Sequence, residues 1–100
     1  MLLIAGTIRI QAEDRDAVVA AMVEMNAESA AEQGCVCYDF SADLVDPTLF
    51  HLFEEWESEA HLAAHGSSPH MGVFQEALGG VGPIERSIHI YETDAKKSLD

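Results

Sequence analysis

Four of the five histidines in this chain lie in one segment, between residues 50 and 74. His65 stands just before Ser67-Ser68-Pro69, a run typical of a helix end followed by a tight turn. An imidazole at such a turn can point into a pocket beside a sheet, and histidine suits proton transfer near neutral pH. The residues alone leave a second interpretation open, in which His65 only hydrogen-bonds a loop carbonyl and fixes the turn.

A metal site is the second chemistry that the histidines suggest. His61 lies four residues before His65, so the two rings share a helix face as a zinc-binding pair would. The residue after His61 is Leu62, whereas the H-E-x-x-H motif requires Glu there. The glycine-rich stretch 79–83 also lacks the Lys-Ser or Lys-Thr ending of a phosphate-binding loop. We therefore predict no metal site and no other cofactor.

Glu54 lies between Leu52 and Trp56 on an apolar face of a predicted strand. A carboxylate there must find a partner or have a raised pKa. Arg86, on the apolar face of the last predicted strand, is a natural partner, so Glu54 is either half of a buried ion pair or an acid of a site. Trp56, the only tryptophan, either fills the core or stacks against a planar ligand.

The elements that must position these groups follow from periodicity. Apolar and polar residues alternate over four stretches, which predicts strands at residues 2–10, 35–45, 49–57 and 84–93. Helical spacing predicts a long helix over residues 14–33 that stops at Gly34, a short helix capped by Ser58, and another that begins at Ser67-Ser68-Pro69. This order is the split β-α-β arrangement of an α+β, ferredoxin-like domain, with an antiparallel sheet and helices on one face.

The opposite face of the sheet is predicted to carry Leu3, Ala5, Phe53 and Tyr91. This is more apolar surface than a sheet usually leaves in water, so we expect a homodimer whose two sheets face one another. Within the first strand, Gly6 predicts a bulge or the close approach of another group.

The two cysteines, Cys35 and Cys37, are predicted to project from the same face of a strand. So short a loop rarely closes a relaxed disulfide, and we interpret both as reduced thiols. No Lys, Arg or His lies close in sequence to lower a thiol pKa, which argues against a reactive pair.

Composition limits the classes of partner. The chain has 100 residues, 48% of them hydrophobic and 23% charged, which fits one folded domain over residues 1–94 with a polar tail over residues 95–100. Five basic residues against 18 acidic ones give a net charge of -13, which disfavours nucleic acid and acidic membranes. No apolar run approaches the roughly 20 residues of a membrane span, and the start lacks signal-peptide features, so we expect a cytoplasmic protein.

One set of residues resembles a known family. It comprises Gly34-Cys35, Tyr38, Asp46-Pro47, Phe50, Glu54-Glu55-Trp56, Leu62, His65, Ser68-Pro69-His70 and Phe74. The pattern is similar to the antibiotic biosynthesis monooxygenase family, especially its small quinol-monooxygenase-like members, and it covers nearly the whole chain. Its densest part is a Glu two residues before a Trp, a His nine residues after that Trp, and a Ser-Pro-His that follows.

The resemblance implies a dimeric α/β barrel and a monooxygenase that oxidises a quinol or polycyclic phenol with O₂, without flavin or metal. It implies that His65 is the catalytic base, with Glu54 and Tyr38 as neighbours in the catalytic group. An electron-rich phenolate can itself reduce O₂, so the protein need only bind the ring, remove a proton and exclude water. Four residues are then expected to bind the substrate: Trp56, Phe50 and Phe74 at the ring, and Arg86, which with Tyr38 could stabilise an oxyanion.

Other functions in proteins of this fold remain as alternatives. A dimer that only binds a small ligand is one, since fold does not guarantee chemistry. An isomerase of a small phosphosugar is another, although only Arg9 and Arg86 fall in the predicted strands to meet a phosphate. Haem degradation is disfavoured because the first strand carries Gly6-Thr7 where those relatives have Asn. The sequence names no substrate and does not say whether His61, His65 or His70 faces the pocket.

Overall fold

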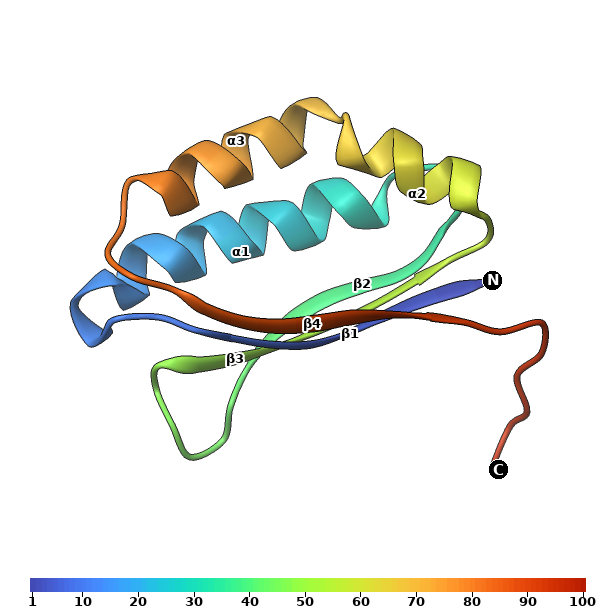
Figure 1. Cartoon of the computed structure of the whole chain (residues 1–100), viewed down its shortest axis with the longest axis horizontal. Helices are drawn as coiled ribbons and strands as arrows, with labels where there is room; N and C mark the ends of the chain where they lie inside the picture. Colours follow the sequence, from blue (N-terminus) through green and yellow to red (C-terminus); the bar gives the residue numbers. More distant parts are fainter.

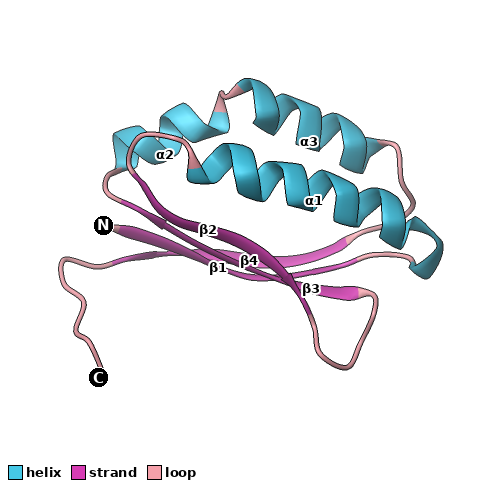
Figure 2. Cartoon of the chain, turned by 180° about the vertical axis from the view of Figure 1, so that it is seen from behind, coloured by secondary structure: helices cyan, strands magenta, loops and turns pink.

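A computed structural model describes all 100 residues as one sheet covered by helices on one face (Figure 1). The strands are β1 (Leu2–Arg9), β2 (Cys35–Ala42), β3 (Leu49–Trp56) and β4 (Glu85–Glu92), in the spatial order β2-β3-β1-β4 with every neighbouring pair antiparallel. The helices are α1 (Arg15–Ala30), α2 (Glu59–Gly66) and α3 (Pro69–Gly79), with a short 3₁₀ turn before α1. Seen from behind, all three lie on the same side of the sheet (Figure 2). The predicted α+β, ferredoxin-like fold is confirmed.

The helix boundaries have the local causes that the sequence predicted. The Ser58 hydroxyl accepts a hydrogen bond from the His61 N–H at the start of α2. Ser68 does the same for Met71 at the start of α3, where Pro69 occupies the first turn. Gly34, shortly after α1, has φ +81°, a conformation that residues with a Cβ rarely adopt. The chain can therefore turn back into β2 only because glycine stands there.

The core lies between the helices and the inner face of the sheet. Its largest fully buried side chains are Trp56, Met25 and Val18. Gly6 marks a close approach, as predicted, because a Cβ at this position would overlap the Ser87 carbonyl of β4. Burial of apolar surface from β1, β2, β3 and α1 in one cluster holds the two layers together.

The start of β2 differs from the prediction. The register shifts between Cys35 and Cys37, so that Cys35 pairs with Trp56 and Cys37 with the next residue, Glu55. The two cysteines therefore face opposite sides of the sheet, and the prediction that they share one face was wrong, because a bulge at Val36 breaks the period of two. Both are free thiols, as predicted. Burial, the largest cause, together with nearby negative charge, raises the pKa of Cys35 to about 11.

The end of β2 also comes earlier than predicted. The strand stops at Ala42, and Leu44 and Val45 are exposed in the loop to β3. The Asp43 carboxylate accepts hydrogen bonds from the backbone N–H groups of Val45 and Asp46, which closes this loop in place of strand pairing.

The outer face of the sheet is uncovered by helices (Figure 1). Phe53 is 42% exposed and Tyr91 is 53% exposed on this face, while Leu3 and Ala5 are half-buried. The C-terminal segment runs past the same face, where Lys96 Nζ lies 2.9 Å from Glu55 Oε2. The predicted apolar surface is therefore present.

None of the three α-helices combines the length and the apolar character that a bilayer crossing requires.

Candidate functional site

A cavity of about 510 Å³ lies between the inner face of the sheet and helices α2 and α3. All four strands contribute to its wall, and 11 of its 16 lining residues are hydrophobic, so a ligand that fills it must be largely apolar. The volume lies within the roughly 300–1,000 Å³ typical of small-molecule sites. Its polar side chains are Tyr38, Glu54, His65, Gln75 and Arg86.

His65, at the end of α2, is one of the polar side chains that line this cavity. The residue is only 2% exposed, and its Nε2 atom is buried without a hydrogen-bond partner. Its other nitrogen, Nδ1, lies 2.5 Å from Glu32 Oε2. Because a carboxylate can only accept hydrogen bonds, Nδ1 carries the hydrogen, and Nε2 of the neutral ring is left with a lone pair. A lone pair without a partner beside a cavity is the geometry of a general base.

Neighbouring rings and the α2–α3 turn fix the orientation of His65. Its ring centroid lies 4.7 Å from that of Trp56 and 5.3 Å from that of Tyr38. The Ser68 hydroxyl donates to the His65 carbonyl at 2.7 Å while it caps α3. The turn that the sequence indicated therefore holds the backbone, and the aromatic rings hold the imidazole.

Glu54 lies on the inner face of β3 and is only 5% exposed. Its Oε1 accepts a hydrogen bond of 2.8 Å from the indole N–H of Trp56. Burial raises the pKa of Glu54, and this effect outweighs the hydrogen bond from Trp56 and the proximity of His65, which both lower it. The carboxyl group is thus held beside the imidazole in a setting that resists its ionisation.

The ion pair between Glu54 and Arg86 is not formed. Glu54 pairs across β1 with the position of Ile90, whereas Arg86 stands four residues earlier in β4. The two positions are therefore about 13 Å apart along the strands and about 10 Å apart across them. Arg86 is exposed at the opposite end of the cavity and has no ion-pair partner.

Tyr38 pairs directly with Glu54 across the β2–β3 ladder. Burial of the phenol, followed by the nearby Glu54 charge, raises the pKa of Tyr38 well above its ordinary value. The hydroxyl therefore stays protonated under ordinary conditions, which makes it a possible hydrogen-bond donor rather than a base.

The structure places the seven predicted site residues in two groups. His65, Glu54, Tyr38, Phe74 and Arg86 line the cavity together. The remaining two, Trp56 and Phe50, do not: Trp56 is fully buried behind His65 and Glu54, and Phe50 packs under the Arg15 guanidinium, 5.5 Å from its ring centroid, in a separate groove. Of the three histidines left open by the sequence, His65 faces the cavity. His61 packs over Gly34 and lies 2.8 Å from the Ser58 hydroxyl.

Sequence reasoning missed Glu32 as a residue of the site and left the place of His70 open. Glu32, just after α1, bonds His65, and the same oxygen lies 2.8 Å from Nε2 of His70. One signal was available, because an acidic side chain at the C-terminal end of a helix opposes the helix dipole and so needs a local partner.

Glu32, His65 and His70 are also the chain's one group of ligand types that could hold a metal ion. Two ligands of a tetrahedral zinc ion, each about 2.05 Å from the metal, stand roughly 3.3 Å apart. The separations of 2.5 and 2.8 Å seen here are those of hydrogen bonds. The geometry therefore describes a hydrogen-bonded cluster, and the metal-binding fit is poor without rearrangement.

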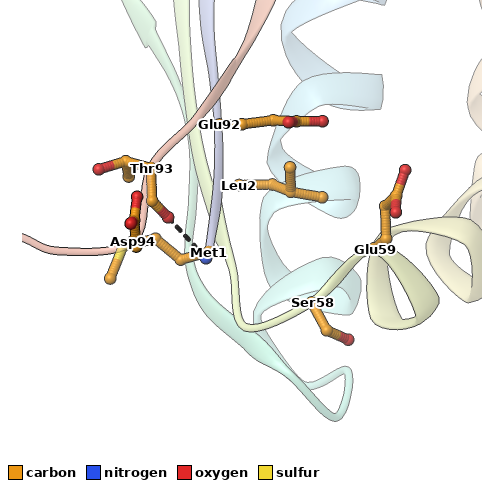
Figure 3. Close-up of a pocket in the computed structure, with 7 residues that line it drawn as sticks. All are labelled: Met1, Leu2, Ser58, Glu59, Glu92, Thr93 and Asp94. Carbon is orange, nitrogen blue, oxygen red and sulfur yellow. Dashed lines mark hydrogen bonds between the residues drawn. The ribbon is translucent and has the colours of Figure 1, made fainter.

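A second hollow of about 450 Å³ lies where β1 begins and β4 ends (Figure 3). Three carboxylate residues line it, Glu59, Glu92 and Asp94, and the terminal amine of Met1 donates to the Thr93 carbonyl at 2.8 Å. It contains no histidine, arginine or aromatic side chain. Only two of its seven lining residues are hydrophobic, so it offers little apolar surface to an aromatic ring.

The fold and the first cavity together define a small ferredoxin-like domain with a histidine and a glutamate in the wall of an apolar pocket. Residues 1–77 match the family described as antibiotic biosynthesis monooxygenase. The chain belongs to this family.

Individual relatives agree with this assignment. The chain is 31% identical to the probable quinol monooxygenase YgiN of Escherichia coli, over 92% of this chain and 97% of that protein. It is also 26% identical to PA3566 of Pseudomonas aeruginosa, with a TM-score of 0.81 and 94% of each chain covered. A Deinococcus radiodurans structure that carries the same family name has a TM-score of 0.89 at 24% identity, over 100% of this chain and 99% of that one. This last likeness concerns the fold alone.

Proposed function

We propose that this chain is a monooxygenase that oxidises a quinol or polycyclic phenol with O₂, and that the reaction uses neither flavin nor metal. The observation that carries the proposal is His65, which lines an apolar cavity and whose Nε2 atom is a buried acceptor without a partner. A ring that fills the cavity would present a hydroxyl group to this nitrogen. Membership of the family and the likeness to YgiN support the same reaction class.

In the proposed reaction His65 Nε2 accepts the proton of the phenol and leaves a phenolate. The electron-rich ring then reduces O₂, and a carbon–oxygen bond forms at a ring carbon that carries hydrogen. The resulting peroxide takes the proton back from His65. Loss of water, with the hydrogen of that carbon, gives a carbonyl, so one phenol and one O₂ yield one quinone and one water. The protein removes and returns a proton, while the substrate supplies the electrons.

The remaining cavity residues have roles consistent with their surroundings. The Tyr38 hydroxyl, which stays protonated, would donate to the oxyanion that develops on the substrate. A negative charge on Glu54 would stabilise the imidazolium of His65 once it forms, since the two groups interact. Phe74 would pack against the ring, and Arg86 would meet an oxygen substituent at the far end.

Trp56 and Phe50 take different places in the proposal from those expected. Trp56 holds Glu54 through its indole N–H and packs against His65, so it would act on the substrate through these two groups. Phe50 lies outside the cavity and has no direct role in the proposed reaction.

We also propose that two copies pair through the outer face of the sheet and work in the cytoplasm. Phe53 and Tyr91 are large apolar side chains exposed on this face, and a second copy would remove them from water. Two free cysteines suit a reducing compartment. Light scattering at micromolar concentration should give the mass of a dimer, and a clean monomer would contradict the pairing.

The reaction is tested by O₂ uptake with a panel of hydroquinones and anthrones, in protein treated with a chelator. The variant His65→Asn keeps an N–H near the Nδ1 position for Glu32 but lacks the second nitrogen. We expect uptake to fall about 10²- to 10⁴-fold in this variant. His61→Asn is the matched control on the same helix and should retain activity. Uptake that is equal in His65→Asn and in the unmodified protein would contradict the assignment of the base.

A further inference from the structure

We infer that His70 is a positioning residue, which acts through Glu32 to fix the nitrogen of His65 that carries the hydrogen. The expected effect of His70 on turnover rests on the proposed function. Its expected effect on which nitrogen of His65 carries the hydrogen does not.

One carboxylate oxygen of Glu32 is shared by the two histidines. Glu32 Oε2 lies 2.5 Å from His65 Nδ1 and 2.8 Å from His70 Nε2. The two histidines flank the break between α2 and α3, and Glu32 follows the end of α1. The carboxylate therefore joins three elements, and both rings must point an N–H at it because the oxygen can only accept.

The orientation of Glu32 depends on this second hydrogen bond. Its side chain is 17% exposed, so water is within reach, and a glutamate side chain has several rotamers in which its carboxylate would leave the cluster. An N–H from His70 to the same oxygen favours the one rotamer that also serves His65. Without His70, the carboxylate would divide its time between His65 and water.

The orientation of Glu32 in turn decides the state of His65. A neutral imidazole can carry its hydrogen on either nitrogen, and the hydrogen bond at one nitrogen selects between them. The other groups packed on the ring are Trp56 and Tyr38, which contact it through their rings, and His70. Glu32 is the only hydrogen-bond partner of Nδ1. Loss of its acceptor would let the hydrogen move to Nε2, and the base in the cavity would then be blocked.

His70 itself lies outside the cavity. It lines a separate, mostly apolar groove of about 240 Å³ between α1 and α3, and its side chain is 15% exposed. A ligand in the cavity would therefore touch His65 but not His70. This separation makes His70 a residue that positions the base without contacting the substrate.

The experiment compares His70→Gln with His70→Ala. Glutamine retains an N–H near the position of Nε2 but does not titrate, whereas alanine removes the donor. Two-bond ¹H–¹⁵N spectra at a pH where His65 is neutral should show hydrogen on Nδ1 in the unmodified protein and in His70→Gln. In His70→Ala the His65 signals should move toward a mixture of the two forms. Unchanged His65 signals in His70→Ala would overturn the inference.

Turnover gives a second readout. We expect His70→Ala to lower kcat by about 10- to 100-fold, the range usual for partners that orient a functional group, and His70→Gln to retain most of it. Equal losses in both variants would show that titration of His70 matters and would overturn a purely positioning role. If the spectra change as expected but no panel compound is oxidised by any form of the protein, the proposed function fails and the inference stands.

A double variant tests whether His70 acts only through Glu32. Because both effects pass through one carboxylate, His70→Ala should add nothing in a Glu32→Ala background. Additive losses would contradict this route. Calorimetric titration with Zn²⁺ alone should show no tight binding. A zinc complex that both substitutions abolish would instead make the three residues a metal site and overturn the inference.

Discussion

Glu54 and Glu55 are adjacent in β3, and the sheet gives them opposite surroundings. Glu54 faces the helices, accepts a hydrogen bond from Trp56 and has a raised pKa without a neighbouring lysine or arginine. Glu55 faces outward, where it pairs with Lys96 of the C-terminal segment. Both residues are buried, at 5% and 8% exposed, yet Glu54 lies beside the imidazole and Glu55 anchors the C-terminal segment, because successive residues of a strand point to opposite faces.

The same contrast separates the two faces as a whole. The inner face carries the groups that could do chemistry, and rings or hydrogen bonds fix His65, Glu54 and Tyr38 there, whereas Arg86 is exposed and unpaired. The outer face has the exposed Phe53 and Tyr91, which no other part of the chain covers. Substitutions on the inner face are therefore expected to lower the stability of a single chain. Substitutions on the outer face are expected to lower stability only when two chains pair.

The largest expected effect on stability is that of Trp56→Ala on the inner face of β3, compared with Phe53→Ala on its outer face. Trp56→Ala should lower the free energy of unfolding by about 3–5 kcal/mol, because it empties a fully buried volume and removes the donor to Glu54. Phe53→Ala should cost less than about 1 kcal/mol in a monomer. Urea unfolding measures both. Similar losses of unfolding free energy in the two variants at low protein concentration would contradict the difference between the faces. A loss in Phe53→Ala that grows with protein concentration would support it.

The next effect concerns the turn that leads from α1 into the inner face. Gly34→Ala should cost about 1–3 kcal/mol, because a Cβ at φ +81° is strained and would overlap the His61 ring. Gly72→Ala, in α3 where a Cβ meets nothing, should stabilise the protein by up to about 1 kcal/mol. Thermal melts of the pair provide the test. A neutral Gly34→Ala would show that this turn does not depend on glycine.

The smallest effect is a dependence of stability on pH at Glu54. Because burial raises the folded pKa of Glu54 above its ordinary value of 4.5, its ionised form costs stability at neutral pH. Glu54→Gln keeps an acceptor for Trp56 and should therefore be slightly more stable at pH 7. The difference should shrink as the pH falls through the raised pKa and vanish below 4.5, where the carboxyl is protonated in both states. Urea unfolding between pH 4 and 8 measures it, and an advantage that grows toward low pH would contradict the burial of this group.

The sequence predicted the elements well because each rests on local causes. The alternation of β3, the serine caps of α2 and α3 and the stop at Gly34 all follow from neighbouring residues, and the structure has each of them. The bulge at Val36 could not be predicted in this way. It depends on how β2 meets β3, and it moved Cys35 and Cys37 to opposite faces.

The candidate site was predictable in part for the same reason. Periodicity indicates which face a residue takes, so Glu54 and Arg86 were correctly placed on the inner face, but it does not give their distance along the sheet. The ion pair between them does not form, because the strand register places Arg86 four residues away from the position level with Glu54. Glu32, His65 and His70 come from three different elements, and only the folded chain brings them to one oxygen atom.

The most direct test of His65 as a base needs no oxygen. A polycyclic phenol whose neutral and ionised forms absorb differently is bound under anaerobic conditions, at a pH below its own pKa in water. The unmodified protein should bind it as the phenolate, with the proton on His65, and His65→Asn should bind it as the neutral phenol. Ionisation to the same extent in both proteins, or binding of the neutral phenol by both, would contradict the central claim that the unpartnered Nε2 removes the proton.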